Sequence, residues 1–144
     1  MPVHTYDPKN NVLTIDAVPM SGFADGTYIT VTFDEDAFTK VVGADGEVSR
    51  AKSNNYSGSV VATFVQTSMS NDVLSAIALL DKLSNSGVVP VLLKEIGTNN
   101  IVMSGEGWIK KVPDIVYSKE VENREWTLDL ANLHVFIGGN PLPS

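Results

Sequence analysis

The chain has 144 residues, 43% apolar and 19% charged, which is the size and composition of one folded globular domain. Its 10 Lys and Arg against 17 Asp and Glu give a formal net charge of −7, which argues against nucleic-acid binding through a basic surface. The chain contains no cysteine, so disulfides, thiolate catalysis and cysteine-ligated metal sites are excluded.

Short runs of alternating apolar and polar residues dominate the chain and predict half-buried strands. The apolar members expected to face a core are Leu13, Ile15 and Ala17; Ile29, Val31 and Phe33; and Trp126, Leu128 and Leu130. The pairs Asp25-Gly26 and Asp45-Gly46 are typical of tight hairpins. The second pair predicts a hairpin tip between residues 39–42 and 47–49.

Two further runs, residues 60–66 and 88–93, are apolar on both faces of a predicted strand. Such a strand is buried on both faces, by its own fold or by a neighbouring subunit. Val61 and Val65 lie on the second face of the first run, and we predict that they and residues 88–93 lie in or near subunit contacts. Pro90 indicates a strand start, an edge or a bulge, because proline donates no ladder hydrogen bond.

One α-helix is predicted over about residues 70–84. Ser70 or Asn71 can cap the amino end of the helix, and Asp72 suits the positive end of the helix dipole. Lys82 and Gly87 are typical of the carboxyl end of a helix. The expected buried face consists of Val73, Ala76, Ile77, Leu80 and Leu83. One helix among several strands indicates a mainly β sandwich or barrel with the helix packed on the sheet.

Residues 43–58 form a long polar stretch in which Val48, Tyr56 and small alanines are the apolar members. A polar excursion of this length inside a compact domain is typically functional or disordered. We interpret it as a long projecting hairpin loop.

The common catalytic arrangements are not recognisable. The two histidines are His4 and His134, and no Gly-x-Ser-x-Gly motif presents a serine, so we interpret His134 as a structural or interface residue. Asp34-Glu35-Asp36 is interpreted as a solvated acidic turn and Gly105-Glu106-Gly107 as a bulge or turn before Trp108. No catalytic residue, metal or cofactor is expected.

One enzymatic alternative stays open. Glycoside hydrolysis needs two carboxylates at a certain distance, and the fold rather than the spacing in sequence determines that distance. The available carboxylates are Glu95, Glu106, Glu120, Glu122 and Glu125. A small glycan-binding or glycan-cleaving β-domain is therefore the alternative from a different class.

The chain is also expected to have neither a membrane anchor nor a signal peptide. Its longest apolar run, Val73 to Leu80, is interrupted by Ser75 and is far shorter than the roughly 20 residues that span a bilayer. The first eight residues contain no apolar stretch.

Several segments of the chain form a recognisable set. The longest runs from Asp36 to Ala51. The shorter ones are Gly22–Gly26, Ser53–Asn55, Gln66–Ser68, Ser70–Asp72, Trp108–Lys111, Asn123–Trp126 and Gly138–Asn140. Together these segments resemble the tail tube proteins of contractile-tailed bacteriophages, and the resemblance extends from about Tyr6 to Asn140.

The resemblance implies a β-sandwich or barrel of the phage tail tube type, with one domain over residues 1–144. Residues 1–10 would be an N-terminal arm, 43–58 the loop that reaches the neighbouring ring, and 138–144 a C-terminal tail. Subunits would form hexameric rings with a continuous inner barrel, and the rings would stack into a hollow tube inside a contractile sheath. DNA would pass through this tube into the host.

The implied partners are copies of the same chain, the sheath protein and the tail terminator and baseplate proteins, with transient, non-specific passage of DNA. The implied location is the tail of the virion, assembled in the bacterial host cytoplasm. An alternative in the same class is the inner tube of a tailocin-like injection device.

An acidic lumen would repel DNA phosphates and let the genome slide. The lumen candidates are Asp16, Asp34, Asp36 and Asp129. The candidates for assembly interfaces are Glu47, Arg50, Lys52, Asn54, Asn55, Tyr56, Val61, Val65, Lys110, Lys111 and Arg124. Among these, Arg50 and Lys52 are predicted to meet acidic groups on the next ring, and the lysine pair is predicted to make salt bridges at an interface.

Overall fold

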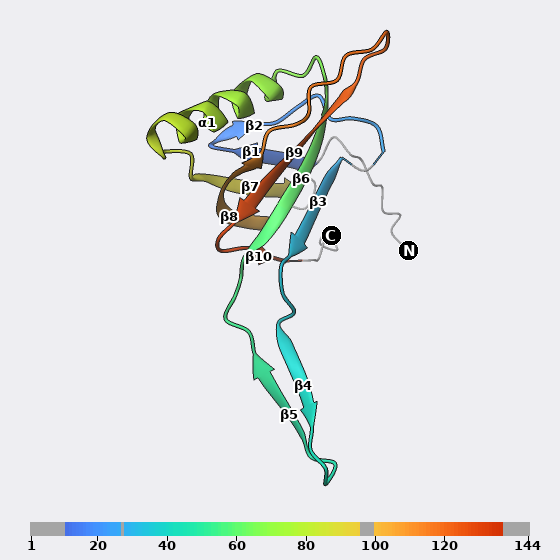
Figure 1. Cartoon of the computed structure of the whole chain (residues 1–144), viewed down its shortest axis with the longest axis vertical. Coiled ribbons are helices and arrows are strands. Elements are labelled where there is room, and N and C mark those ends of the chain that lie inside the picture. Colours follow the sequence, from blue (N-terminus) through green and yellow to red (C-terminus); the bar gives the residue numbers. More distant parts are fainter. Residues whose placement is uncertain (1–10, 27, 96–99, 137–144) are drawn as a thin grey trace, which may run out of the picture.

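The computed structural model describes residues 11–26, 28–95 and 100–136. Within them the chain forms one helix and two antiparallel sheets (Figure 1). The elements are β1 (Asn11–Ile15), β2 (Val18–Pro19), β3 (Ile29–Phe33), β4 (Phe38–Val42), β5 (Val48–Lys52), β6 (Gly58–Val65), α1 (Ser70–Ser84), β7 (Val89–Glu95), β8 (Asn100–Lys111), β9 (Asn123–Leu130) and β10 (His134–Val135).

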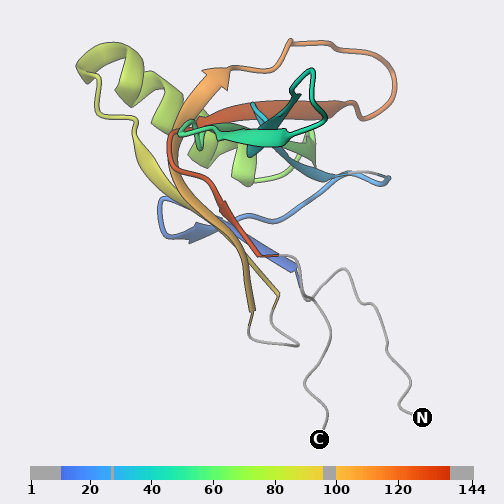
Figure 2. The ribbon, with the colours of Figure 1, turned by 90° about the horizontal axis from the view of Figure 1, so that it is seen from below.

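The larger sheet has the strand order β2-β1-β7-β8-β9-β6-β3, and β10 pairs with β8 beside this path. The long strand β8 joins two halves, because it pairs with β7 from Asn100 to Gly107 and with β9 from Gly107 to Lys111. In Figure 2 the two halves diverge from β8, and the core residues come from both halves. The sheet is not closed, since it ends at β2 and β3. The mainly β class with one helix is thus confirmed, in the form of a bent open sheet.

The core lies between the two halves and is closed on one side by α1. β1 and β7 contribute Leu13, Ile15 and Val91, while the other half contributes fully buried residues such as Phe64 and Leu128. The ring of Phe64 stacks on that of Phe23 with 4.9 Å between the centroids. Burial of these side chains supplies the main stabilising free energy of the domain.

The alternating patterns are confirmed where strands lie inside the sheet. Trp126, Leu128 and Leu130 on β9 are all buried, as are Leu13 and Ile15 on β1. The prediction for Ala17 is wrong, because the chain reverses there in a turn with positive φ at both Asp16 and Ala17.

The run from Ile29 to Phe33 is buried less than predicted. β3 is an edge strand that pairs with β6 alone, so Ile29 and Val31 are half-buried and Phe33 is exposed. Asp25-Gly26 forms a bend rather than the tip of a hairpin.

The helix α1 has the predicted bounds, but its amino end is not capped as predicted. Met69 occupies the cap position and makes no side-chain cap. Ser70 instead exchanges hydrogen bonds with the backbone of Ser21: its Oγ accepts from N–H at 2.8 Å and donates to the carbonyl at 2.9 Å. Asn71 accepts from Trp126 Nε1 at 2.9 Å. Both side chains are used for tertiary contacts, which leaves none for the cap.

The predicted buried face of α1 is confirmed for Ile77 and, in part, for Val73, which packs against the core, but it is wrong for Ala76, Leu80 and Leu83. The buried residues are Ser70, Leu74 and Ile77, whereas Leu80 and Leu83 are 51% and 75% exposed. The buried residues lie on a different side of the helix from Ala76, Leu80 and Leu83. The carboxyl-terminal half of α1 also overhangs the sheet (Figures 1 and 2). Most of the apolar stripe in the sequence is therefore not covered by its own chain.

The prediction of a bulge or turn at Gly105-Glu106-Gly107 is wrong as well, because these residues lie inside β8. A Cβ at Gly107 would lie 2.3 Å from the carbonyl oxygen of Asp129, and one at Gly105 would lie 2.7 Å from that of Asn132. The glycines thus permit close backbone approach where the two halves of the sheet meet. Within the described residues, no helix is long and apolar enough to span a membrane.

Candidate assembly surfaces

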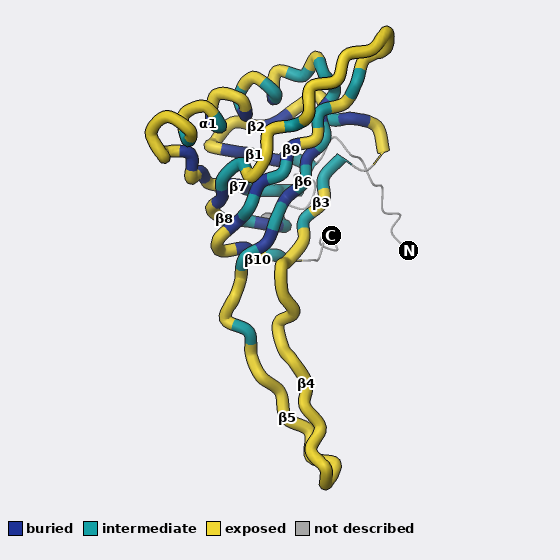
Figure 3. The backbone as a smooth tube through the Cα atoms, viewed as in Figure 1, coloured by how far each residue is buried: buried dark blue, intermediate teal, exposed yellow. Residues whose placement is uncertain are grey.

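The β4–β5 hairpin, here called the arm (residues 38–52), projects from the body of the domain (Figure 1). All residues of its two strands are exposed (Figure 3). The tip closes at the predicted Asp45-Gly46, where Gly46 has a φ of +87° and the Gly43 N–H donates to the Glu47 carbonyl at 2.7 Å. The predicted hairpin is confirmed, and it begins before residue 43 because β4 is its first strand.

The strand register gives the arm two different faces. Phe38 pairs with Lys52, Lys40 with Arg50, and Val42 with Val48, and directly paired residues project from the same face. These six residues, here called the cationic face, therefore lie together. The Arg50 guanidinium lies 4.1 Å from the centroid of the Phe38 ring, a cation–π contact within the arm.

Sequence reasoning selected Arg50 and Lys52 but missed Lys40. The usable signal was the hairpin register, since a tip at Asp45-Gly46 places Lys40 opposite Arg50. The other face carries Thr39, Val41, Ser49 and Ala51 and is uncharged.

The base of the arm is acidic and hydrogen-bonded. Ser57 Oγ donates to Asp34 Oδ2 at 2.8 Å, and Ser53 Oγ donates to Glu35 Oε2 at 3.0 Å. Asp34 to Asp36 are exposed, as expected for a solvated turn. Asn55 Oδ1 also accepts from the Ser57 N–H at 3.1 Å. Asn54, Asn55 and Tyr56 lie in the irregular segment between β5 and β6 that returns from the arm to the body.

Charge is divided unevenly between the arm and the body. Residues 38–52 carry three cations and two anions, a formal charge of +1, whereas the whole chain carries −7. The remaining residues therefore sum to −8. One copy's arm and another copy's body have charges of opposite sign.

The outer face of β6 and β9 is a second candidate surface. It presents the residues between the buried ones: Ser59 pairs with Asp129 and Val61 with Thr127. Val61 and Val65 are half-buried there. Of the four lumen candidates, Asp129 lies on this face, Asp16 lies in the β1–β2 turn, and Asp34 and Asp36 lie at the base of the arm.

The loop between β8 and β9 is a third candidate surface. It is flanked by Lys110, Lys111 and Arg124. Lys111 Nζ lies 3.8 Å from Asp114 Oδ1, with both side chains exposed. This ion pair is formed within the chain, and its exposure makes its contribution to stability small. Arg124 Nη2 donates to the Val116 carbonyl at 3.3 Å.

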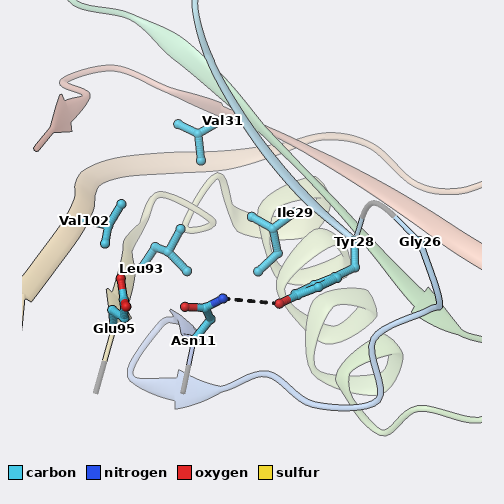
Figure 4. Close-up of a pocket in the computed structure, with 8 residues that line it drawn as sticks. All are labelled: Asn11, Gly26, Tyr28, Ile29, Val31, Leu93, Glu95 and Val102. Atoms are coloured by element: carbon cyan, nitrogen blue, oxygen red, sulfur yellow. Dashed lines mark hydrogen bonds between the residues drawn. The ribbon is translucent and has the colours of Figure 1, made fainter. Parts of the chain in front are cut away.

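A groove of about 450 Å³ lies between β3 and the ends of β7 and β8, where the sheet fails to close (Figure 4). Its lining is mostly apolar, with the Asn11 amide donating to the Tyr28 hydroxyl at 3.3 Å. Glu95 is the one charged residue in the lining. Among the residues that the structure describes, no group of three His, Asp or Glu side chains could hold a metal ion.

The sequence profile of the family described as bacteriophage PhiTE tail tube protein matches residues 13–138. The chain belongs to this tail tube family. It is also 28% identical over 144 residues to "Structural protein ORF10" of Pseudomonas phage KPP10, an alignment that covers 94% of this chain and 83% of that relative. The predicted resemblance is thereby confirmed, and the protein is a structural component of a phage tail.

Solved structures with the same fold come from tails and injection systems. The tail of an empty GTA particle, refined with C6 symmetry, has a TM-score of 0.63 at 12% identity and covers 92% of this chain and 99% of that one. The cap that terminates the anti-feeding prophage tube has a TM-score of 0.62 at 10% identity, over 94% and 93%. The sheath–tube complex of an extracellular contractile injection system, PVC, gives 0.53 at 10%, over 92% and 93%.

Membership in a structural family means that the chain is not an enzyme. The glycan-cleaving alternative is therefore discarded. His134 is an exposed residue of β10, paired with Ser104 of β8.

Proposed function

We propose that this chain forms hexameric rings that stack into the hollow tube of a phage tail, surrounded by a contractile sheath and used for DNA ejection. Family membership supports the tube. The six-fold symmetry of the GTA tail, which has the same fold, supports a hexameric ring. The fold shared with a sheath–tube complex supports contact with a sheath.

The observation that carries this proposal is the arm. An isolated two-stranded hairpin is at best marginally stable in water, yet this one is fully exposed and displays Phe38, Val41, Val42 and Val48. A second chain that covers it would supply the missing stabilisation. We assign the arm, including Glu47 at its tip, to contact with the next ring.

Complementary charges on the arm and the body would favour this contact between rings. The cationic face places Lys40, Arg50 and Lys52 side by side, and the body of each further copy is acidic. Opposite charges on the arm and on the next ring favour their association, and the surplus acidity disfavours unspecific contact between bodies. Asn54, Asn55 and Tyr56 extend the same surface to the base of the arm.

Ring closure would use the open sheet. Among the described strands, β3 pairs on one side only, and an edge that pairs with a neighbouring subunit no longer exposes unpaired backbone groups. Rings closed in this way would form the inner barrel, with the outer face of β6 and β9 towards the lumen. Asp129 would then contribute negative charge to the wall and repel DNA phosphates. Asp16, Asp34 and Asp36 would lie at the rims, and Val61 and Val65 near the subunit boundary.

The further partners in this proposal are the tail terminator and baseplate proteins at the two ends of the tube, with assembly in the bacterial host cytoplasm. The tube of a tailocin-like injection device is the second candidate, because the anti-feeding prophage and PVC systems contain the same fold. Both candidates share this fold, so the neighbouring genes distinguish them.

Deleting the arm tests the proposal. Residues 39–51 are replaced by Asn-Gly, which joins the paired residues Phe38 and Lys52 by a two-residue turn. We expect a folded protein with unchanged tryptophan fluorescence that forms rings but no stacked tubes in negative-stain micrographs. Tubes of wild-type length from this variant would contradict the role of the arm. A wild-type protein that stays dispersed, at high concentration and in particles alike, would contradict the whole proposal.

A further inference from the structure

Two exposed apolar patches of the described chain have no role in the proposed stacking of rings or in the proposed pairing of sheet edges. The first, here called the leucine stripe, consists of Ala76, Leu79, Leu80 and Leu83 on α1. The second, here called the apolar loop, is residues 112–121 between β8 and β9. Its exposed apolar members are Val112, Ile115, Val116, Tyr117 and Val121.

The leucine stripe is a separate face of α1. At 100° per residue, its members lie within about a third of the helix circumference. The buried residues Ser70, Leu74 and Ile77 point to another side. Leu79 is 56% and Leu83 75% exposed, and the stretch from residue 73 to residue 80 contains no charge. Three exposed leucines on one face exceed the scattered apolar residues of an ordinary surface and indicate an interaction site.

The apolar loop is held in shape by its polar groups, which leaves the apolar side chains outside. Arg124 Nη2 donates to the Val116 carbonyl, and its guanidinium lies 5.7 Å from the Tyr117 ring centroid. Ser118 Oγ donates to Glu122 Oε1 at 2.7 Å. Tyr117 is nevertheless 76% exposed. A preorganised loop with an exposed aromatic side chain and little charge at its centre has the composition of an interface core.

The two patches lie on opposite flanks of the molecule. Figures 1 and 2 share their horizontal axis, and both place the carboxyl end of α1 at the left and the loop after β8 at the right. In Figure 1 the arm projects from the opposite end of the body, away from both patches. A closed ring of identical subunits requires two different, complementary patches on opposite flanks, one for each neighbour.

We infer that the leucine stripe of one copy packs against the apolar loop of the next copy in the same ring. This inference rests on the proposed ring and names its lateral contact, separate from the arm that joins successive rings. A second copy of this chain is the binding partner, because the chain itself carries both the leucine stripe and the apolar loop. Both surfaces are apolar and uncharged at their centres. Tyr117 would be buried among the leucines, and Lys110, Lys111 and Arg124 would lie at the polar rim.

Cross-linking tests this contact directly, since the chain has no native cysteine. Leu83→Cys is combined with Ile115→Cys, and assembled protein is treated with a short bismaleimide. We expect covalent multimers that end in a closed ring, and only unlinked subunits from either single variant. The matched control combines Leu83→Cys with Phe136→Cys, a residue of similar exposure outside both patches, and we expect no multimers from it.

Leu83→Glu provides a second readout that does not depend on linker geometry. Because Leu83 is exposed in the single chain, the variant should keep the melting temperature of the wild type and lose at least ten-fold in ring formation. The inference would be overturned if the wild type forms tubes, the double-cysteine variant gives no cross-links and Leu83→Glu assembles normally. That combination would leave the proposed function intact. Helix-to-helix links from Leu83→Cys alone, or links to a sheath protein in isolated tails, would also overturn it. Absence of any wild-type ring would instead defeat the proposed function.

Discussion

The cationic face of the arm allows a sharp comparison between two neighbouring positions. Lys40 projects from this face, next to Arg50, whereas Thr39 projects from the uncharged face. Both side chains are exposed. Lys40→Thr and Thr39→Glu each change the charge of the arm by −1, so a general charge effect would be the same in both variants. A specific contact through the cationic face predicts that Lys40→Thr has the larger effect.

The expected magnitude follows from exposed ion pairs and from the number of arms. One exposed pair contributes about 0.5 kcal/mol, and six arms in the proposed ring give about 3 kcal/mol for each junction between rings. Since 1.4 kcal/mol corresponds to a factor of ten, Lys40→Thr should weaken ring stacking by about 100-fold at low salt. The loss should shrink towards 1 M salt, where the Debye length falls to about 3 Å.

The assay is the critical concentration for tube formation, measured by sedimentation in a series of salt concentrations and checked by negative-stain microscopy. Unfolding followed by tryptophan fluorescence is the folding control, and both variants should stay within about 0.5 kcal/mol of the wild type. Equal effects of Lys40→Thr and Thr39→Glu, or a Lys40→Thr effect that does not respond to salt, would refute the reasoning.

Two further predictions concern the stability of the body. Asn71→Ala removes the acceptor of the buried Trp126 Nε1–H, so we expect a loss of about 2–3 kcal/mol in unfolding free energy. Gly107→Ala brings a Cβ to 2.3 Å from the Asp129 carbonyl oxygen, which forces β8 and β9 apart and should cost more than about 3 kcal/mol. Urea unfolding followed by tryptophan fluorescence measures both, with the exposed Asn54→Ala as the control. Wild-type midpoints would show that the hydrogen bond or the close approach is unimportant.

Local features of the fold were predictable from the chain alone. The bounds of α1, the hairpin tip at Asp45-Gly46 and the buried face of β9 each depend on residues close together in sequence. The family resemblance was also visible there, because the run from Asp36 to Ala51 lies in one continuous segment. Even Lys40 could have been found, since a known hairpin tip defines the register of both strands.

Features that depend on distant segments were not predictable. Ser70 and Asn71 look like helix caps, but Ser21 and Trp126, both about fifty residues away, use them for tertiary hydrogen bonds. Gly105 and Gly107 look like a turn until β9 and the following loop are placed against them.

The apolar pattern of α1 shows the same division most clearly. Alternation and helical spacing report which side chains avoid water, and these follow from residue type and the 3.6-residue period of a helix. They do not report which chain covers them. The pattern predicted one buried face, whereas the bent sheet covers Leu74 and Ile77 and leaves Leu80 and Leu83 exposed. Only the packing of the sheet against the helix separates the apolar side chains that build the domain from those left for a neighbour.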